Sequence, residues 1–361
     1  MSVCAFEHPI LSGLLGDGEL AALFDSEADI AAMLRFELAL AQAQAECGVI
    51  SNQDAENIAS AIAKFRLDLS ALRAALGIDG VVVPELVRQL RATVGQPSDA
   101  KVHFGATSQD VIDSSLMLRL KAAANVLVRR LAAVADSLSA LVQRDGHRSL
   151  MGYTRMQAAI PIGAADRIMT WQAPLERDLS RLSVLLEANF AIQFGGAAGT
   201  LEKLGDKGSA VRAALATRLD LVDLPQWHNQ RDLLAEFAGV LSLITGTLGK
   251  FGQDIALMAE VGGEIVLAGG GGSSAMPHKQ NPVAAELLVT LARFNAAQIS
   301  AIHHSLVHEQ ERSGSAWVLE WLVLPPMVSA TGVALLTADR LLGQIQMIGR
   351  GSGGLIDDSG I

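Results

Sequence analysis

Hydrophobic residues follow one long helical period through the middle of the chain. Between Val111 and Asp145 there is no glycine or proline, and apolar residues recur at steps of three and four positions. These residues are Leu116, Leu120, Ala123, Leu127, Leu131, Val134, Leu138 and Leu141. The period places them along one face of an α-helix, which at about 1.5 Å per residue is roughly 50 Å long. Because one helix cannot bury such a stripe alone, the pattern predicts neighbouring long helices.

Further segments carry the same kind of pattern, and they are residues 161–189, 230–260, 283–313 and 317–348. We expect Pro174 to kink the first of them, and Pro325-Pro326 to break the last. Several glycines in 230–260 would let neighbouring helices approach closely. Hardly any segment alternates between apolar and polar residues. The predicted fold class is therefore all-α, a bundle of long helices.

This bundle accounts for a central domain, residues 106–340, that lies between two smaller parts. Residues 1–105 are expected to form an N-terminal helical domain. Its helices should run from Glu27 to Cys47, from Ser51 onward, and from Pro84 to Val94. Residues 341–361 are expected to form a short, irregular C-terminal tail.

The loop 262–282 is the part of the chain richest in candidate chemistry. Four glycines, Gly269 to Gly272, precede Ser273, Ser274, Lys279 and Asn281, and two prolines exclude a regular helix. Glycine is conformationally free, so the segment is typical of a mobile loop that closes over a substrate and opens again. A flexible surface linker is the alternative. The long helical pattern that follows at once favours the catalytic loop, since a linker rarely leads straight into a core helix.

Three other polar segments are candidates for the same site. Thr107 to Asp110 precedes the long helix, where its side chains would cap the helix and free amide hydrogens would attract carboxylates. The second segment runs from Thr154 to Gln157, and the third from Trp227 to Arg231. No metal-ligand spacing and no dinucleotide or phosphate-loop motif occurs in the sequence. We therefore expect a site without a metal or a cofactor.

Composition narrows the function classes. Half of the residues are hydrophobic, only 4% are aromatic, and the formal net charge is −10 with the two signs interspersed. This argues against nucleic acid as a partner, because nucleic acid requires a basic face, and an anionic substrate would need local cations. Cys4 and Cys47 indicate neither a metal site nor a disulfide framework, so we expect a reduced, cytoplasmic setting. We recognise no signal peptide and no apolar run long enough for a membrane span, so the high hydropathy predicts burial, including burial between subunits.

Residues 272–281 read Gly-Ser-Ser-x-Met-Pro-x-Lys-x-Asn, which is similar to the signature of the fumarase/aspartase superfamily. The resemblance implies a homotetramer whose long central helices pack in a common bundle, with each active site built from three chains. It implies that Ser273 is the acid/base at the substrate's α-carbon, and that Lys279 and Asn281 hold a substrate carboxylate. Further substrate contacts are expected from Ser274, Thr107, Ser108, Thr154 and Gln157.

One position departs from the lyase pattern. The lyases carry Gly-x-Thr-His-x-Gln, whereas residues 152–157 read Gly-Tyr-Thr-Arg-Met-Gln, so Arg155 stands where a histidine assists the lyase reaction. An arginine stays protonated and cannot shuttle a proton, but it can hold a carboxylate by two-point contact. Standard lyase chemistry is therefore disfavoured, and a small polycarboxylate, in particular a tricarboxylate, is favoured as the substrate. A surface or inter-subunit ion pair is the alternative role for Arg155.

Longer runs are similar to the bacterial 3-carboxy-cis,cis-muconate cycloisomerases, which also lack that histidine. The runs are VHFGATSQDVID at 102–113, QFGGAAGTL at 193–201, WHNQRD at 227–232 and HEQERSGSAWVLEW at 308–321. This resemblance implies a lactonising isomerisation in the β-ketoadipate pathway, in which one carboxylate adds across a conjugated double bond. The alternatives are a fumarate-releasing lyase of the adenylosuccinate or argininosuccinate type, and a helical scaffold without activity.

Two residues in these runs are further candidate substrate contacts. His103 either contacts the substrate or orients the Thr107–Ser108 element, and Arg231 either binds the substrate or forms a helix-face salt bridge. The roles of His147, His228 and His308 stay open between structure and function. The chain is also short for the superfamily, whose members usually add a small helical C-terminal domain. The sequence does not decide whether that domain is naturally absent.

Overall fold

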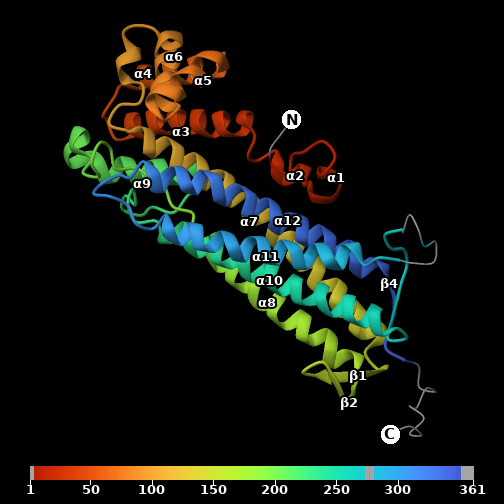
Figure 1. The fold of residues 1–361 in the computed structure, drawn as a ribbon. Helices are drawn as coiled ribbons and strands as arrows, with labels where there is room; N and C mark the ends of the chain where they lie inside the picture. Colours follow the sequence, from red (N-terminus) through yellow and green to blue (C-terminus); the bar gives the residue numbers. More distant parts are fainter. Residues whose placement is uncertain (1–3, 273–275, 277–279, 351–361) are drawn as a thin grey trace, which may run out of the picture.

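Five long helices form the body of the protein. The computed structural model describes residues 4–272, 276 and 280–350. The long helices are α7 (Ser108–Asp145), α8 (Ala164–Ala188), α10 (Asp232–Val261), α11 (Val283–His304) and α12 (Ser315–Gln344). They lie side by side along one long axis (Figure 1). The all-α bundle predicted from the hydrophobic period is confirmed.

Shorter helices precede the bundle. They are α1 (Ser12–Leu15), α2 (Gly18–Ala21), α3 (Ser26–Glu46), α4 (Asn52–Ala63), α5 (Leu69–Asp79) and α6 (Val83–Val94), followed by the 3₁₀ turn η1 (Ser98–Lys101). Ser51 begins α4 as predicted, because its hydroxyl accepts a hydrogen bond from the Asp54 amide at 3.1 Å. Helices α4, α5 and α6 stand together beyond one end of the bundle, and α3 packs against both α4 and α7 (Figure 1). The domain boundary near residue 105 stays a prediction.

Residues 149–163 form a β-hairpin, which the hydrophobic pattern did not indicate. Strand β1 (Ser149–Thr154) pairs antiparallel with β2 (Gln157–Gly163), and Met151 lies opposite Pro161. The helix expected from Pro161 therefore begins at Ala164, where the Asp166 carboxylate accepts a hydrogen bond from the Gly163 amide at 2.9 Å. The side chains of β2 are almost all exposed, so the strand lacks the alternating pattern by which strands are recognised.

Prolines interrupt the long helices less than expected. Helix α12 continues through Pro325 and Pro326, and the predicted break there is wrong. The residues on both sides of this pair are fully buried, so packing in the bundle holds the segment helical. Pro174 lies inside the single helix α8, and the kink expected there stays a prediction.

The last helices end earlier than their patterns suggest. Helix α11 ends at His304, whereas the apolar period extends to residue 313. After α12 the chain becomes extended, and β4 (Ile345–Ile348) pairs antiparallel with β3 (Ile265–Leu267). The isolated bridge between Ser149 and Arg350 continues this contact toward β1. Within the described residues, 345–348 are thus strand and Arg350 forms a bridge, rather than an irregular tail.

Close approach of α10 and α11 depends on two glycines. A Cβ atom built on Gly249 would lie 2.5 Å from the Cβ atom of Ala292, and one built on Gly252 would lie 2.5 Å from the carbonyl oxygen of Ala285. Any side chain at either position would force the helices apart. Close approach thus explains two of the four glycines in the 230–260 segment, whereas Cβ atoms built on Gly239 and Gly246 would meet nothing within 4 Å. The remaining short elements, η2 (Glu202–Lys207) and α9 (Gly208–Leu219), connect α8 to α10, and α9 packs on α3.

Two of the long helices resemble membrane spans by length and composition alone. These are α10 and α12, so the expectation that no apolar segment is long enough does not hold. Their most apolar windows are 50% and 67% buried inside the bundle, respectively. Core helices of soluble proteins pass the same test, and burial accounts for the apolar character of α12 in particular.

Candidate functional site

The predicted site segments lie at two ends of the bundle. Thr107 stands at the N-terminus of α7 and the hairpin follows its C-terminus, so the whole 38-residue helix, roughly 57 Å at 1.5 Å per residue, separates them. The 227–231 segment lies at the Thr107 end, because His228 contacts Asp110. The loop base lies at the hairpin end, because the Met151 amide donates to the Glu264 carboxylate at 3.0 Å. Within one chain, the Thr107 segment therefore lies beside the 227–231 segment, and the hairpin lies beside the loop base at the other end.

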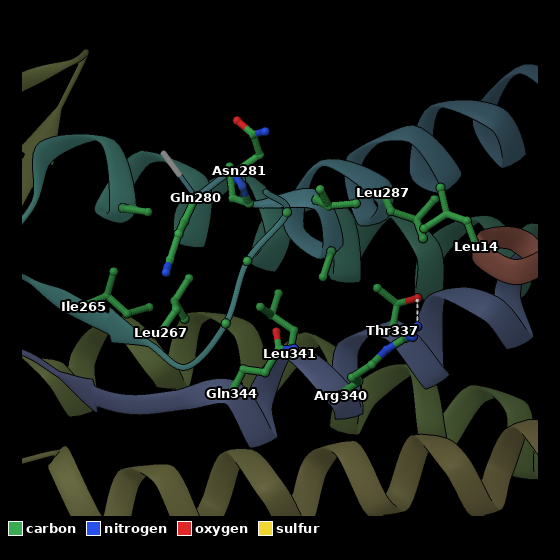
Figure 2. Close-up of a pocket in the computed structure, with 17 residues that line it drawn as sticks. Leu14, Ile265, Leu267, Gln280, Asn281, Leu287, Thr337, Arg340, Leu341 and Gln344 are labelled. Atoms are coloured by element: carbon green, nitrogen blue, oxygen red, sulfur yellow. Dashed lines mark hydrogen bonds between the residues drawn. The ribbon is translucent and has the colours of Figure 1, made fainter. Parts of the chain in front are cut away.

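The two arms of the signature loop are joined at their base. Gly271 and Asn281 exchange two backbone hydrogen bonds, of 2.9 and 2.8 Å. A pocket of about 390 Å³ lies beneath them, lined by Leu267 of β3, Leu341 of α12 and the loop arms. In Figure 2 the Gln280 side chain points toward Leu267, whereas the Asn281 amide points away from the pocket. Ser273, Ser274 and Lys279 lie outside the described residues.

The hairpin turn presents a group of free polar side chains. Arg155 and Met156 occupy the two turn positions between Thr154 and Gln157, with φ angles of +47° and +65°. All four residues are exposed, and the side chains of Thr154, Arg155 and Gln157 have no hydrogen-bond or ionic partner among the described residues. Arg155 lines a cleft of about 510 Å³ between the hairpin and helices α8 and α10. An unpaired guanidinium at such a position can bind an anion.

Asp110 holds together three segments that are far apart in the sequence. Its buried carboxylate accepts hydrogen bonds from the amides of Thr107, Gly195 and Gly196 at 2.9 to 3.0 Å. The His228 Nε2 lies 2.8 Å from the same carboxylate. The segment therefore caps the helix as expected, and the capping side chain is that of Asp110, which accepts a hydrogen bond from the Thr107 amide. Ser108 makes no side-chain hydrogen bond with the described residues.

Arg231 belongs to a buried cluster of charges one turn further along α7. Its guanidinium is fully buried and binds the carboxylates of Asp113, at 2.6 and 3.2 Å, and Glu320, with its Nε at 2.8 Å from Oε1. Trp317 Nε1 also donates to Asp113, at 2.9 Å. Burial alone would lower the pKa of Arg231, but the two carboxylates raise it above its ordinary value. A substrate contact by Arg231 would require this cluster to open, so the geometry favours the salt-bridge alternative.

His103 is held by an acidic partner that the sequence did not indicate. The His103 Nδ1 lies 2.6 Å from a carboxylate oxygen of Glu37, which is a buried residue of α3. Burial lowers the pKa of His103, but the charge and the hydrogen bond of Glu37 outweigh it, so the pKa lies above its ordinary value. The contact with Glu37 is compatible with both predicted roles of His103, a substrate contact and orientation of the Thr107–Ser108 element.

Sequence reasoning missed the acidic members of these clusters, Glu37, Asp113 and Glu320. Each is a carboxylate inside an otherwise apolar helical segment, and each is at least 98% buried in the fold. Carboxylates are almost never buried unless paired, so an acidic residue on an apolar stripe was the available signal. Among the described residues no group of three histidine, cysteine or acidic side chains could hold a metal ion.

A family model described as lyase matches residues 20–297, which is most of the chain. The chain belongs to the fumarase/aspartase superfamily. The fold of this chain is similar to the crystal structure of 3-carboxy-cis,cis-muconate lactonizing enzyme from Pseudomonas putida. The two have a TM-score of 0.87 and 34% sequence identity. The alignment covers 94% of this chain and 77% of that one.

Curated relatives narrow the position of the chain within the fumarase/aspartase superfamily. The chain is 37% identical over 337 residues to 3-carboxy-cis,cis-muconate cycloisomerase of Acinetobacter baylyi. This alignment covers 90% of this chain and 74% of the relative. The chain is 33% identical over 335 residues to N-acetyl-S-(2-succino)cysteine lyase of Enterococcus italicus, covering 91% and 73%, respectively. The chain thus spans about three quarters of the length of these relatives.

Proposed function

We propose that this protein is a cycloisomerase that converts 3-carboxy-cis,cis-muconate to a carboxymuconolactone in the degradation of protocatechuate. The relatives named for this reaction support the proposal, at 36 to 38% identity. The observation that carries it is Arg155, which is exposed, has no ionic partner among the described residues, and stands at a strained turn where the lyases have a histidine. A permanent cation at this point suits a substrate with three carboxylates and does not suit proton transfer.

The reaction is intramolecular and needs no outside nucleophile. One substrate carboxylate forms a C–O bond to the conjugated double bond, and the displaced electron pair takes up a proton at the carbon next to another carboxylate. Ser273 would deliver this proton, and Lys279 and Asn281 would hold the carboxylate that becomes doubly charged. One preorganised donor of this kind typically contributes about 3 kcal/mol to the transition state. Holding the attacking carboxylate near its target carbon supplies much of the remaining acceleration.

The arrangement of the segments supports a site shared between chains. Within one chain, Thr107 and Ser108 lie a full helix length from the hairpin and the loop base. A site that uses all of these residues therefore has to combine several protomers, as in a homotetramer whose long helices pack together. Exposed apolar side chains on the bundle, such as Val184 of α8 and Leu243 of α10, are available for such packing. We place the assembly in the cytoplasm.

Absorbance measurements test the proposed function directly. Purified protein mixed with 3-carboxy-cis,cis-muconate should remove the absorbance of the conjugated diene, and it should form the lactone without releasing fumarate. Ser273→Ala should abolish this change while leaving the fold intact. Unchanged diene absorbance, together with fumarate release from a succinyl substrate, would instead assign the protein to the lyase branch.

A further inference from the structure

Helix α3 fixes the segment that leads into the Thr107–Ser108 element. The Glu37 carboxylate lies 2.6 Å from His103 Nδ1, and the Gln44 side-chain amide donates to the Phe104 carbonyl at 2.6 Å. The His103 carbonyl accepts from the Ala106 amide, which closes the turn just before α7. The position of the imidazole relative to the start of α7 is therefore set by two side chains of one helix.

This arrangement carries two unfavourable features. The backbone of His103 is left-handed, with a φ angle of +61°, although a glycine would adopt it more easily. Glu37 is 2% exposed, and its second carboxylate oxygen is buried without a hydrogen-bond partner among the described residues. Strained backbone and buried charge persist where the surrounding structure enforces them, and such features cluster at functional sites.

The charges around the ring favour its protonated form. Glu37 faces it from α3 and Asp110 from α7, while Arg91 of α6 acts in the opposite direction. Burial lowers the pKa of His103, but the two carboxylates raise it above its ordinary value. Nδ1 is occupied by Glu37, whereas Nε2 has no partner among the described residues and is not fully buried. When protonated, the ring, whose side chain is 14% exposed, offers one charged N–H group at Nε2.

We propose that Glu37 is a positioning residue that holds His103 as a cation, so that its Nε2 binds a substrate carboxylate beside the N-terminus of α7. This inference rests on the proposed function, because it assigns Thr107 and Ser108 to the same carboxylate subsite. Free amides and hydroxyls at a helix start attract anions. An imidazolium next to them adds a charge-assisted hydrogen bond, which is about twice as strong as a neutral one.

The kinetic test is Glu37→Gln, which keeps the shape of the side chain and removes its charge. KM for 3-carboxy-cis,cis-muconate should rise about tenfold at neutral pH while kcat changes little, because the lost contact is made equally in the ground state and the transition state. In the wild type, kcat/KM should fall as pH rises through the raised pKa of His103. In Glu37→Gln this fall should occur at lower pH. Glu37→Asp should restore part of the affinity, and Glu46→Gln, at an exposed pair on the same helix, should match the wild type.

Histidine NMR provides a test that does not depend on turnover. In the wild type the His103 ring, identified by comparison with His103→Gln, should titrate above the ordinary histidine range, and Glu37→Gln should bring it down. Binding of citrate, used as an unreactive tricarboxylate, should weaken over the same pH range. A His103 ring that titrates normally in the wild type, or a Glu37→Gln variant with lowered kcat and unchanged KM, would overturn the inference. Failure of the proposed reaction alone would leave the NMR and citrate results to decide it.

Discussion

At the scale of single residues, three of the six left-handed residues other than glycine in the described chain lie in parts that we assign to substrate binding. His103, Arg155 and Met156 have φ angles of +61°, +47° and +65°. Such a conformation costs an L-residue roughly 1 kcal/mol, and two-residue hairpin turns with positive φ at both positions strongly prefer Asn-Gly. The turn sequence Arg-Met therefore lowers local stability. We attribute its presence to the side chain of Arg155, which the turn exposes.

Relief of this strain can be measured at Met156. Because its side chain is 73% exposed, Met156→Gly removes little packing and should stabilise the protein by about 1 kcal/mol. Met156→Ala keeps the unfavourable Cβ atom and should bring no gain. Urea unfolding followed by circular dichroism gives the free energy of unfolding of each variant. Equal stability of the glycine and alanine variants would contradict strain at this turn.

At the scale of elements, the sequence predicts what depends on local period and misses what depends on distant pairing. The long helices follow from apolar residues at steps of three and four, whose faces the bundle buries. Strand β2 is nearly all exposed, and β3 pairs with a strand some eighty residues further on, so neither has a local pattern. The polar segments of the site could be recognised because their residues are close together in the sequence. Asp113, the partner of Arg231, could not, because one carboxylate in a helix gives no sign of what it binds.

The buried charge cluster that joins α7, α10 and α12 can be separated from substrate binding. Arg231→Met should destabilise the protein by about 3 to 5 kcal/mol, since it leaves Asp113 and Glu320 buried without their cation. Arg129→Met removes a pair with Glu19 whose side chains are 64% and 46% exposed, and it should cost less than about 1 kcal/mol. Denaturant unfolding at neutral pH compares the two. A stable Arg231→Met protein with a raised KM would instead return Arg231 to the substrate site.

At the scale of the whole molecule, one chain is an incomplete enzyme if the proposed residues act together. Asp110 ties Thr107 to the 193–196 and 227–231 segments at one end of the bundle. The hairpin and the loop base are tied to each other at the other end, through Glu264 and Met151. Helix α7 between them is continuous over 38 residues, so within one chain the two ends lie a helix length apart. In the proposed shared site, a second copy of the chain supplies the other half.

Mixing two inactive variants tests this arrangement. Ser273→Ala disables the loop, and Thr107→Ala combined with Ser108→Ala disables the start of α7. When the two proteins are unfolded, mixed in equal amounts and refolded, a site works only if its loop comes from the second variant and its α7 element from the first. For independently drawn chains, one half times one half gives about a quarter of the wild-type activity.

The same experiment carries its own control. Ser273→Ala mixed with Lys279→Ala places both defects on one loop, so every site contains at least one of them and activity should not return. Light scattering on each mixture should show the same assembly as the wild type, larger than one chain. Recovery in the first mixture and none in the second requires that the loop and the start of α7 come from different protomers. If neither mixture regains activity although both assemble, each site draws these two elements from a single chain, and the shared-site proposal fails.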